Sequence, residues 1–358
     1  MKTNQFDYKL PEELIAQYPP ENRGGTRLLV IDRTEKKLYH KKYTDIPEYI
    51  KEGDVVVLNQ TKVINVRTFP KVQRTGSQVE VLFLNNIQYK QNETDAEYWY
   101  GLVGRARHVK IGDKLEYPDG EIIEIDHRNE GETGFVIKVP GDRKSNPTES
   151  IFQKYGHVPL PPYMRRNAGP EDEVRYNTVF AKKKGSVAAP TASLNLTNEI
   201  LDRIKEKGAQ IAYVNLKIGW GTFAPVKTEN VEDFDIHSEY FEITSEAAGK
   251  INNAIKAGSD VWAFGTTVTR ALESSAVKSD ETNNYTVSPG KKSTNLYIYP
   301  GYDWKIVDHL ITNFHAPKSS LIMLVSSFAG TELIKKAYAK AIEMRYNFLS
   351  YGDSTMII

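Results

Sequence analysis

The chain contains no cysteine among its 358 residues. This absence excludes disulfides, thiolate metal sites, iron–sulfur clusters and a cysteine nucleophile. A net excess of charge is also missing, because 47 Lys and Arg residues stand against 46 Asp and Glu residues, a formal net charge of +1. A uniformly basic nucleic-acid-binding protein is therefore excluded, although a local basic patch fits within the neutral total.

Long apolar runs are missing as well. The strongest candidate, residues 321–325, is far shorter than the roughly 18 apolar residues of a membrane span. The opening residues, MKTNQFDYKLPEEL, contain no apolar segment of the kind found in signal peptides. We therefore expect no membrane segment, no signal peptide and a cytoplasmic location.

Common metal and nucleotide motifs are absent too. The seven histidines show no HxxxH spacing, so we expect no metal site. No GxGxxG motif follows a strand-like run, and the uncharged segment 185–198 lacks the Lys-Ser/Thr ending of a P-loop.

What is present is the composition of a folded protein, with 40% apolar and 26% charged residues. A chain of 358 residues exceeds the usual size of one hydrophobic core, which predicts two domains. Residues 54 to about 140 contain short runs rich in Val, Ile and aromatic residues, separated by turn signals. From about residue 180, strand-like runs alternate with helices expected at 197–208, 245–257 and 331–349.

These two patterns predict the fold class. Alternating strands and helices indicate a largely parallel sheet, whereas closely spaced short strands indicate a small antiparallel barrel or sandwich. We expect a mixed α/β main domain formed by residues 1–58 and 150–358. An all-β, barrel-like domain of residues 59–149 is expected to be inserted into it.

Several strand ends carry residues that suit ligand binding. Small residues and hydroxyls fill the segment 185–198, a Gly-Trp-Gly-Thr-Phe run follows a strand at 219–223, and Arg270 starts a helix after Gly265. His237 and Glu239 lie among ionisable groups that suit acid–base chemistry. Each pattern has a structural alternative: a packed turn, a helix-surface ion pair, or a hydrogen-bonded histidine.

The same segments resemble one protein family. The chain is similar to the S-adenosylmethionine:tRNA ribosyltransferase-isomerases of queuosine biosynthesis over essentially its whole length. The shared motifs, in chain order, are FDYxLPEELIAQYP (6–19), TGSQVEVLFL (75–84), GHVPLPPY (156–163), GSVAAPTA (185–192), HSEYFE (237–242), GTTxxRxLES (265–274), YPGY (299–302), ITNFHxPKSSLIMLVSSFAG (311–330) and SYGD (350–353).

This resemblance implies an activity and its partners. The family transfers and isomerises the ribosyl group of S-adenosylmethionine onto 7-aminomethyl-7-deazaguanine in tRNA. The products are epoxyqueuosine-tRNA, adenine and methionine. The resemblance also implies a β-barrel domain inserted in an α/β domain, S-adenosylmethionine as co-substrate without a further cofactor, and we expect a monomer.

The site follows from the reaction and the shared motifs. The sulfonium acidifies the C5′ protons, so the reaction needs a base there and a proton donor for departing adenine. We expect His237, Glu239 and His315 to be catalytic. The residues expected to bind substrate are Ser186, Thr191, Thr222, Thr266, Arg270, Asn313, Lys318 and Ser319.

The chain departs from the family pattern at six polar positions, which are Gln60, Lys62, Asn177, Asn195, Lys217 and Ala224. These departures leave open a relative that uses S-adenosylmethionine with another acceptor, or that only cleaves it. A non-catalytic RNA-binding protein is a third alternative. Against it argue the residues retained together, which are His237, Glu239, Arg270, Asn313, His315 and Lys318. Basic runs at 165–166, 182–184 and 291–292 are candidate phosphate contacts or solvated surface.

Overall fold

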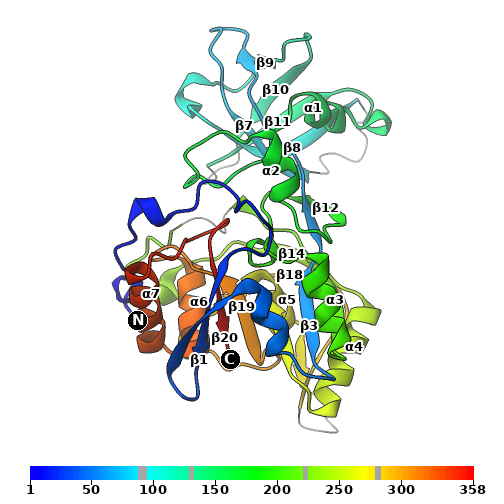
Figure 1. Cartoon of the computed structure of the whole chain (residues 1–358). Helices are drawn as coiled ribbons and strands as arrows, with labels where there is room; N and C mark the ends of the chain where they lie inside the picture. Colours follow the sequence, from blue (N-terminus) through cyan, green and yellow to red (C-terminus); the bar gives the residue numbers. More distant parts are fainter. Residues whose placement is uncertain (88–94, 129–132, 221–224, 279–283) are drawn as a thin grey trace. The chain divides into compact units, whose positions relative to one another are not determined.

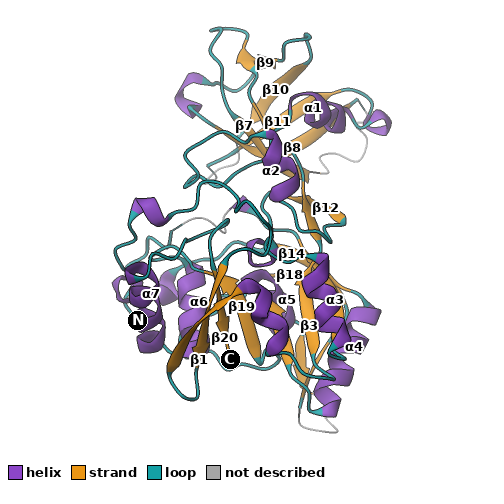
Figure 2. Cartoon of the chain, viewed as in Figure 1, coloured by secondary structure: helices purple, strands orange, loops and turns teal. Residues whose placement is uncertain are grey.

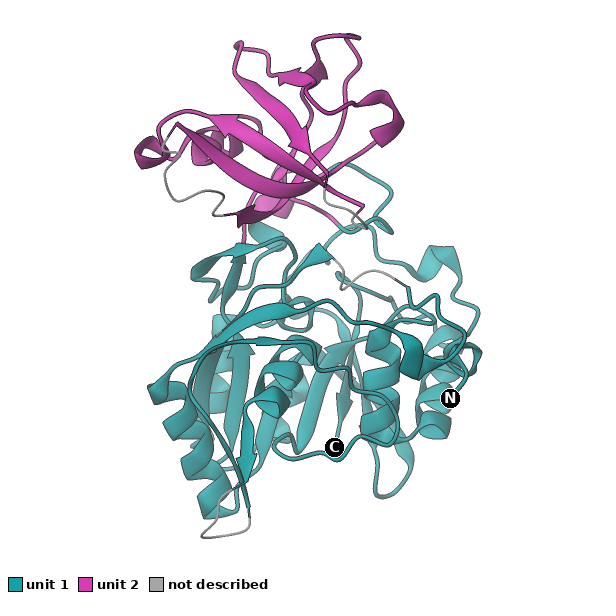
Figure 3. Ribbon diagram, turned by 180° about the vertical axis from the view of Figure 1, so that it is seen from behind, with its two compact units in different colours: residues 1–62, 161–167, 174–358 teal, residues 63–160, 168–173 magenta. Residues whose placement is uncertain are grey.

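The computed structural model describes residues 1–87, 95–128, 133–220, 225–278 and 284–358. The chain divides into two compact units (Figure 3). Unit 1 comprises residues 1–62, 161–167 and 174–358, and unit 2 comprises residues 63–160 and 168–173.

Unit 1 is built on a nine-stranded sheet (Figure 1). Its core is parallel, because β13, β3, β15 and β19 all run in one direction. Antiparallel strands lie at both edges. In spatial order the strands are β18 (Gly290–Thr294), β14 (Glu239–Ile243), β13 (Gln210–Leu216), β3 (Val55–Asn59), β15 (Val261–Phe264), β19 (His309–Asn313), β20 (Ser354–Ile357), β1 (Arg27–Asp32) and β2 (Lys37–Lys42).

The apolar sequence of β3 explains its central place. Val55 and Val57 pack into the core on one face of the sheet, and Val56 and Leu58 pack into the core on the other. All four side chains are fully buried. A strand that is apolar on both faces requires cover on both, which is the usual condition of parallel sheets.

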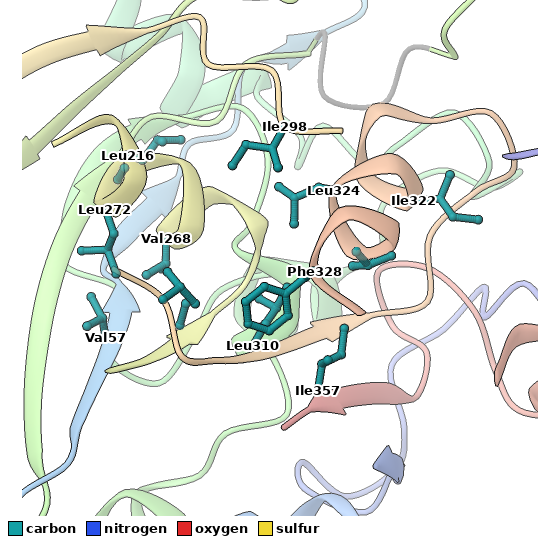
Figure 4. Close-up of a cluster of buried hydrophobic side chains, with 14 of the residues drawn as sticks. Val57, Leu216, Val268, Leu272, Ile298, Leu310, Ile322, Leu324, Phe328 and Ile357 are labelled. Carbon is teal, nitrogen blue, oxygen red and sulfur yellow. The ribbon is translucent and has the colours of Figure 1, made fainter. Parts of the chain in front are cut away.

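Helices supply that cover on both sides of the sheet (Figure 2). One face packs against α4 (Ser245–Ala257), α5 (Thr266–Ser274), α6 (Ser320–Ala329) and α7 (Thr331–Glu343). Figure 4 shows part of this core, where Val57, Leu310 and Ile357 of the sheet lie beneath side chains of α5 and α6. The other face packs against α3 (Asn198–Glu206) and the 3₁₀ helix η3 (Tyr43–Glu48).

Local capping determines two of the predicted helices. The Thr197 hydroxyl accepts a hydrogen bond from the Ile200 N–H at 3.2 Å, which fixes the start of α3. Gly258, with φ of +74°, ends α4 where the sequence predicts. The helix predicted for 331–349 is too long, because α7 ends at Glu343 and the chain turns at Arg345. The aromatic residues that follow pack in the core, and the Phe348 ring lies 4.8 Å from that of Phe314.

Unit 2 contains a seven-stranded antiparallel sheet that curls on itself. Its terminal strands in space, β5 and β6, are separated along the chain by only residues 69–70. Two strands so close in sequence cannot lie at opposite edges of a flat sheet, so the sheet curves to bring its edges together. The spatial order is β5 (Arg67–Thr68), β7 (Val81–Ile87), β8 (Ala96–Val103), β11 (Phe135–Pro140), β10 (Ile122–His127), β9 (Lys114–Glu116) and β6 (Lys71–Val72).

The helix α1 (Pro147–Tyr155) packs on this sheet through an aromatic cluster. The Phe83 ring meets those of Phe152 and Trp99 edge-on, at centroid distances of 5.2 and 5.9 Å. Unit 2 therefore includes the helix α1, which continues beyond residue 149, the predicted end of the all-β domain. The mixed α/β class predicted from the sequence is confirmed.

Smaller elements complete the chain: β4 (Thr61–Val63) pairs with β12 (Lys183–Ser186), β16 (Ala276–Lys278) pairs with β17 (Tyr285–Val287), and α2 spans Pro170–Arg175. Within the described ranges, no helix is both long and apolar enough to cross a membrane.

The aromatic cluster of unit 2 gives a stability prediction. Phe83→Ala should destabilise unit 2 by about 3–5 kcal/mol, because it removes a fully buried ring and leaves a cavity. Ile111→Ala is the control in the same unit; its side chain is 62% exposed, so we expect a change within about 0.5 kcal/mol. Denaturant unfolding measures both, and equal effects would contradict this account of the cluster.

Candidate functional site

Two small cavities lie where the parallel strands of unit 1 end. The threonine cavity, of about 40 Å³, is lined by hydroxyl side chains together with His315. The arginine cavity, of about 50 Å³, is lined by Arg270, Glu239 and His237. Leu321 lines both cavities, and Ile218 of one directly precedes Gly219 of the other, so the two are neighbours. Carboxyl ends of parallel strands are the usual ligand sites of open α/β sheets.

Gly265 shapes the threonine cavity at the end of β15. Its φ of +98° favours glycine, and an added Cβ would lie 3.3 Å from the Ala192 Cβ. The chain can therefore turn sharply into α5 and place Thr266 opposite Thr191. These two predicted residues are brought together, and Thr267 and Thr312 join them in the lining.

His315 is buried in the wall of the threonine cavity. Its ring Nε2 lies 3.1 Å from the Thr312 hydroxyl. Burial lowers the pKa of His315 to about 3, because the charged ring would lose its hydration. The ring is therefore neutral at physiological pH, which differs from the titrating ring expected from the sequence. The neutral ring has one N–H that can donate a hydrogen bond and one nitrogen that can accept one, but it lacks the second N–H of the charged form.

Two tyrosines hold the backbone of His315 from behind. The Tyr8 hydroxyl donates to the His315 carbonyl oxygen, and the His315 N–H donates to the Tyr338 hydroxyl at 3.0 Å. The rings of Tyr8 and Tyr338 meet edge-on at 5.4 Å. Both line an apolar cavity of about 340 Å³ between residues 5–9 and the helices α6 and α7. The backbone of His315 is thus fixed by contacts that come from both ends of the chain.

A buried ion pair forms the floor of the arginine cavity. The Arg270 guanidinium donates to the Glu239 carboxylate, and the two side chains are 7% and 5% exposed. Arg270 also donates to the carbonyl oxygens of Leu296 at 3.0 Å and Thr294 at 3.4 Å. The other Glu239 oxygen accepts the Gly219 N–H at 3.1 Å. Both partners are therefore held by the protein, whereas His237 is exposed at the cavity wall.

Asn313 lies away from both cavities. It follows Thr312 on β19, and successive side chains of a strand point to opposite faces. Its side chain is 2% exposed, and neither amide atom has a hydrogen-bond partner among the described residues. Such a group costs folding free energy unless water or a ligand satisfies it.

Three other predicted residues have structural contacts. The Ser186 hydroxyl accepts the Ile218 N–H at 2.8 Å. The Ser319 hydroxyl caps α6 by accepting the Ile322 N–H at 3.3 Å. Lys318 forms an ion pair with Asp7 at 2.7 Å. Thr222 lies outside the described residues, as does the altered position Ala224.

The described altered positions are not in the lining of either cavity. Asn195 is buried and donates to the Gly352 carbonyl oxygen at 3.3 Å. The Asn177 carbonyl oxygen accepts from Arg23 at 3.0 Å. Lys62 and Lys217 are exposed, and the Gln60 carbonyl oxygen accepts the N–H groups of residues 182 and 183. The described residues also contain no group of three or more His, Asp or Glu side chains that could hold a metal ion.

The sequence missed Thr312, Tyr8 and Tyr338. Thr312 had a usable signal, because it lies three residues before His315 in the same motif. Tyr8 belongs to the shared motif at 6–19, but 307 residues separate it from His315, so spacing along the chain could not pair the two.

The fold places the chain among the open α/β proteins, which usually bind small ligands where their parallel strands end, as the two cavities do here. A family model described as queuosine biosynthesis protein matches residues 3–357. The chain belongs to this family, as its motifs predicted.

Known relatives match over the full length. S-adenosylmethionine:tRNA ribosyltransferase-isomerases from Aquifex aeolicus and Halothermothrix orenii are 42% and 43% identical to this chain, over all of both proteins. The crystal structure of S-adenosylmethionine tRNA ribosyltransferase from Thermotoga maritima is 29% identical, with a TM-score of 0.53. That comparison covers 99% of this chain and 100% of the other.

The ion pair gives a second prediction. Glu239→Gln should destabilise unit 1 by about 3–5 kcal/mol, because it leaves the buried Arg270 charge unpaired. The control is Glu246→Gln, which breaks an exposed pair with Lys250 on α4 and should cost less than about 0.5 kcal/mol. Thermal unfolding compares the two, and a Glu239 effect as small as the control's would show that the pair is not a structural constraint.

The third prediction concerns pH. Because the folded pKa of His315 is about 3 and an unfolded histidine titrates near 6.5, the unfolded chain binds the extra proton between these values. The contribution of the neutral ring to the free energy of unfolding is therefore complete above about pH 6.5, and it is lost as the pH falls toward 3. His315→Gln should remove up to about 1.4 kcal/mol per pH unit of this dependence. Parallel stability curves for variant and wild type would contradict the burial effect.

Proposed function

We propose that this chain is an S-adenosylmethionine:tRNA ribosyltransferase-isomerase. It transfers and isomerises the ribosyl group of S-adenosylmethionine onto 7-aminomethyl-7-deazaguanine in tRNA, with release of adenine and methionine. The observation that carries the proposal is the match to relatives of that name at 42–43% identity over the whole of both chains. The cavities at the strand ends of unit 1 support a site for the small substrate there.

S-adenosylmethionine binds, in this proposal, across the threonine and arginine cavities. Each cavity alone is too small for the whole molecule. Leu321 lines both cavities, so binding of the whole molecule across them requires side chains of the lining to move. The hydroxyls of Thr191, Thr266 and Thr312 then offer hydrogen bonds to the adenosine part.

The two histidines take different roles. His237 is exposed at the arginine cavity, so its ring can accept the C5′ proton that the sulfonium acidifies. Glu239 is held by Arg270 and the Gly219 N–H, and we assign it to fixing the arginine cavity rather than to removing the proton. His315 is neutral and fixed by Thr312, which suits a hydrogen bond to the leaving adenine.

The domain arrangement belongs to the same proposal. Residues 59–149 form a barrel-like domain inserted between the two parts, 1–58 and 150–358, of the α/β domain. The curled seven-stranded sheet supports this proposal. The compact unit that contains the sheet begins 4 residues later, at 63, and its first segment ends 11 residues later, at 160; it also includes residues 168–173.

The test incubates the protein with S-adenosylmethionine and tRNA that carries 7-aminomethyl-7-deazaguanine, and identifies products by mass spectrometry. We expect epoxyqueuosine-tRNA, adenine and methionine in equal amounts. His237→Gln should lower kcat by roughly 10²-fold or more, since the glutamine cannot accept the proton. His127→Gln, a half-exposed histidine of unit 2, is the matched control and should keep wild-type turnover.

Two outcomes would contradict the proposal. Adenine and methionine without modified tRNA would identify an enzyme that only cleaves S-adenosylmethionine. Full turnover in His237→Gln would show that His237 is not the base, although the overall reaction would still be the proposed one.

A further inference from the structure

One exposed region of unit 1 gathers lysines from segments that are distant in sequence. Lys182 and Lys183 lie at the start of β12, and both N–H groups donate to the Gln60 carbonyl oxygen. Lys217 follows β13, and its side chain lies against Gly185 of β12, where an added Cβ would be 3.1 Å from the Lys217 Cε. Lys291 lies on β18 directly opposite Glu242 of β14.

Glu242 interacts electrostatically with two of these lysines, Lys183 and Lys291. Its carboxylate accepts a hydrogen bond from the Lys183 Nζ at 2.7 Å. Lys183 and Lys291 both lower the pKa of Glu242, so the carboxylate is ionised and is already paired. Lys182, Lys217 and Lys291 remain exposed around this pair, which leaves the region with an excess of positive charge.

An aromatic ring stands in the same region. The Tyr240 carbonyl oxygen accepts the Lys217 N–H at 2.9 Å, so Tyr240 is the direct neighbour of Lys217 across the strands. Its side chain is 68% exposed, more than that of any other aromatic residue among the exposed large hydrophobic residues that the structure describes. We call Lys182, Lys183, Lys217, Lys291 and Tyr240 the lysine surface.

The lysine surface and the arginine cavity share β14, but they lie on opposite faces of that strand. Tyr240 directly follows Glu239, so its exposed side chain points to the face opposite that of Glu239, which lines the cavity. A ligand on the lysine surface needs phosphates for the lysines and a planar base for the ring. Lysines with interleaved aromatic residues are the usual contacts to single-stranded nucleic acid.

We propose that the lysine surface binds the tRNA substrate, with its lysines on backbone phosphates and Tyr240 stacked on an unpaired base. This inference rests on the proposed function, because it assigns a surface to the macromolecular substrate of the same site. It also selects among the basic runs of the sequence. Arg165 is paired with Glu12, and Arg166 lies over the Tyr18 ring, so that run has other partners.

The test measures binding of fluorescently labelled, precursor-bearing tRNA to the full-length protein by anisotropy at several salt concentrations. Lys217→Gln and Lys291→Gln should each weaken binding about fivefold and reduce the salt slope by about 0.7 to 0.9. Tyr240→Ala should weaken it about tenfold or more, whereas Tyr240→Phe keeps the ring and should bind like wild type.

Lys336→Gln is the matched control. Lys336 is an exposed lysine on α7, a helix that contacts β1, six places from β14 in the strand order of the sheet. The tRNA affinity of the Lys336→Gln variant, and the salt dependence of that affinity, should equal those of wild type. Binding of S-adenosylmethionine, measured by calorimetry, should be the same in the lysine variants and in wild type.

The outcomes separate this proposal from the proposed function. If wild type modifies tRNA and the lysine and Tyr240→Ala variants bind it with unchanged affinity and slope, the lysine surface is wrong and the function stands. The RNA assignment is overturned if the lysine variants weaken tRNA binding but Tyr240→Ala does not. It is also overturned if poly-glutamate displaces tRNA at equal charge concentration. In either case the surface binds anions in general. A wild type that binds no tRNA overturns both.

Discussion

The buried guanidinium of Arg270 is the contact on which the arrangement of the site depends. It brings α5 into contact with Glu239 at the start of β14, and with the carbonyl oxygens of residues 294 and 296. A charge removed from water must be fully paired, so these segments are held together by the cost of separating them. The arginine cavity is the space that remains above this pair, and His237 reaches it from the chain just before β14.

The same reasoning explains why the two histidines differ. His237 stays in contact with solvent because it precedes the strand, whereas His315 follows β19 into the interior, where Tyr8 and Tyr338 hold its backbone. Burial then sets the protonation state of His315. Position in the fold, and not residue type, therefore gives the two rings different environments.

Local signals in the sequence predicted much of the fold. Thr197 and Gly258 act on their own helices within a few residues, so capping rules were sufficient there. The end of α7 was missed because Phe348 is apolar at a helical spacing but is buried by the distant ring of Phe314. Ser186 and Ser319 look like ligand-binding hydroxyls in sequence, yet their partners are backbone groups that only the folded chain brings near. Residue types at strand ends thus indicated where the two cavities lie, while long-range contacts decide which side chains remain available.

The place of β20 in the sheet affects the order in which the protein can fold. Residues 354–357 lie inside the nine-stranded sheet, between β19 and β1, where Leu28 pairs with Ser354. On the ribosome, β1 emerges more than 300 residues before this partner strand. Until then its apolar residues lack their neighbour, and β1 with β2 can form only an isolated hairpin, which is marginally stable in water. The curled sheet of unit 2 is synthesised within one continuous stretch, so it can close during translation while unit 1 still waits for its last strand.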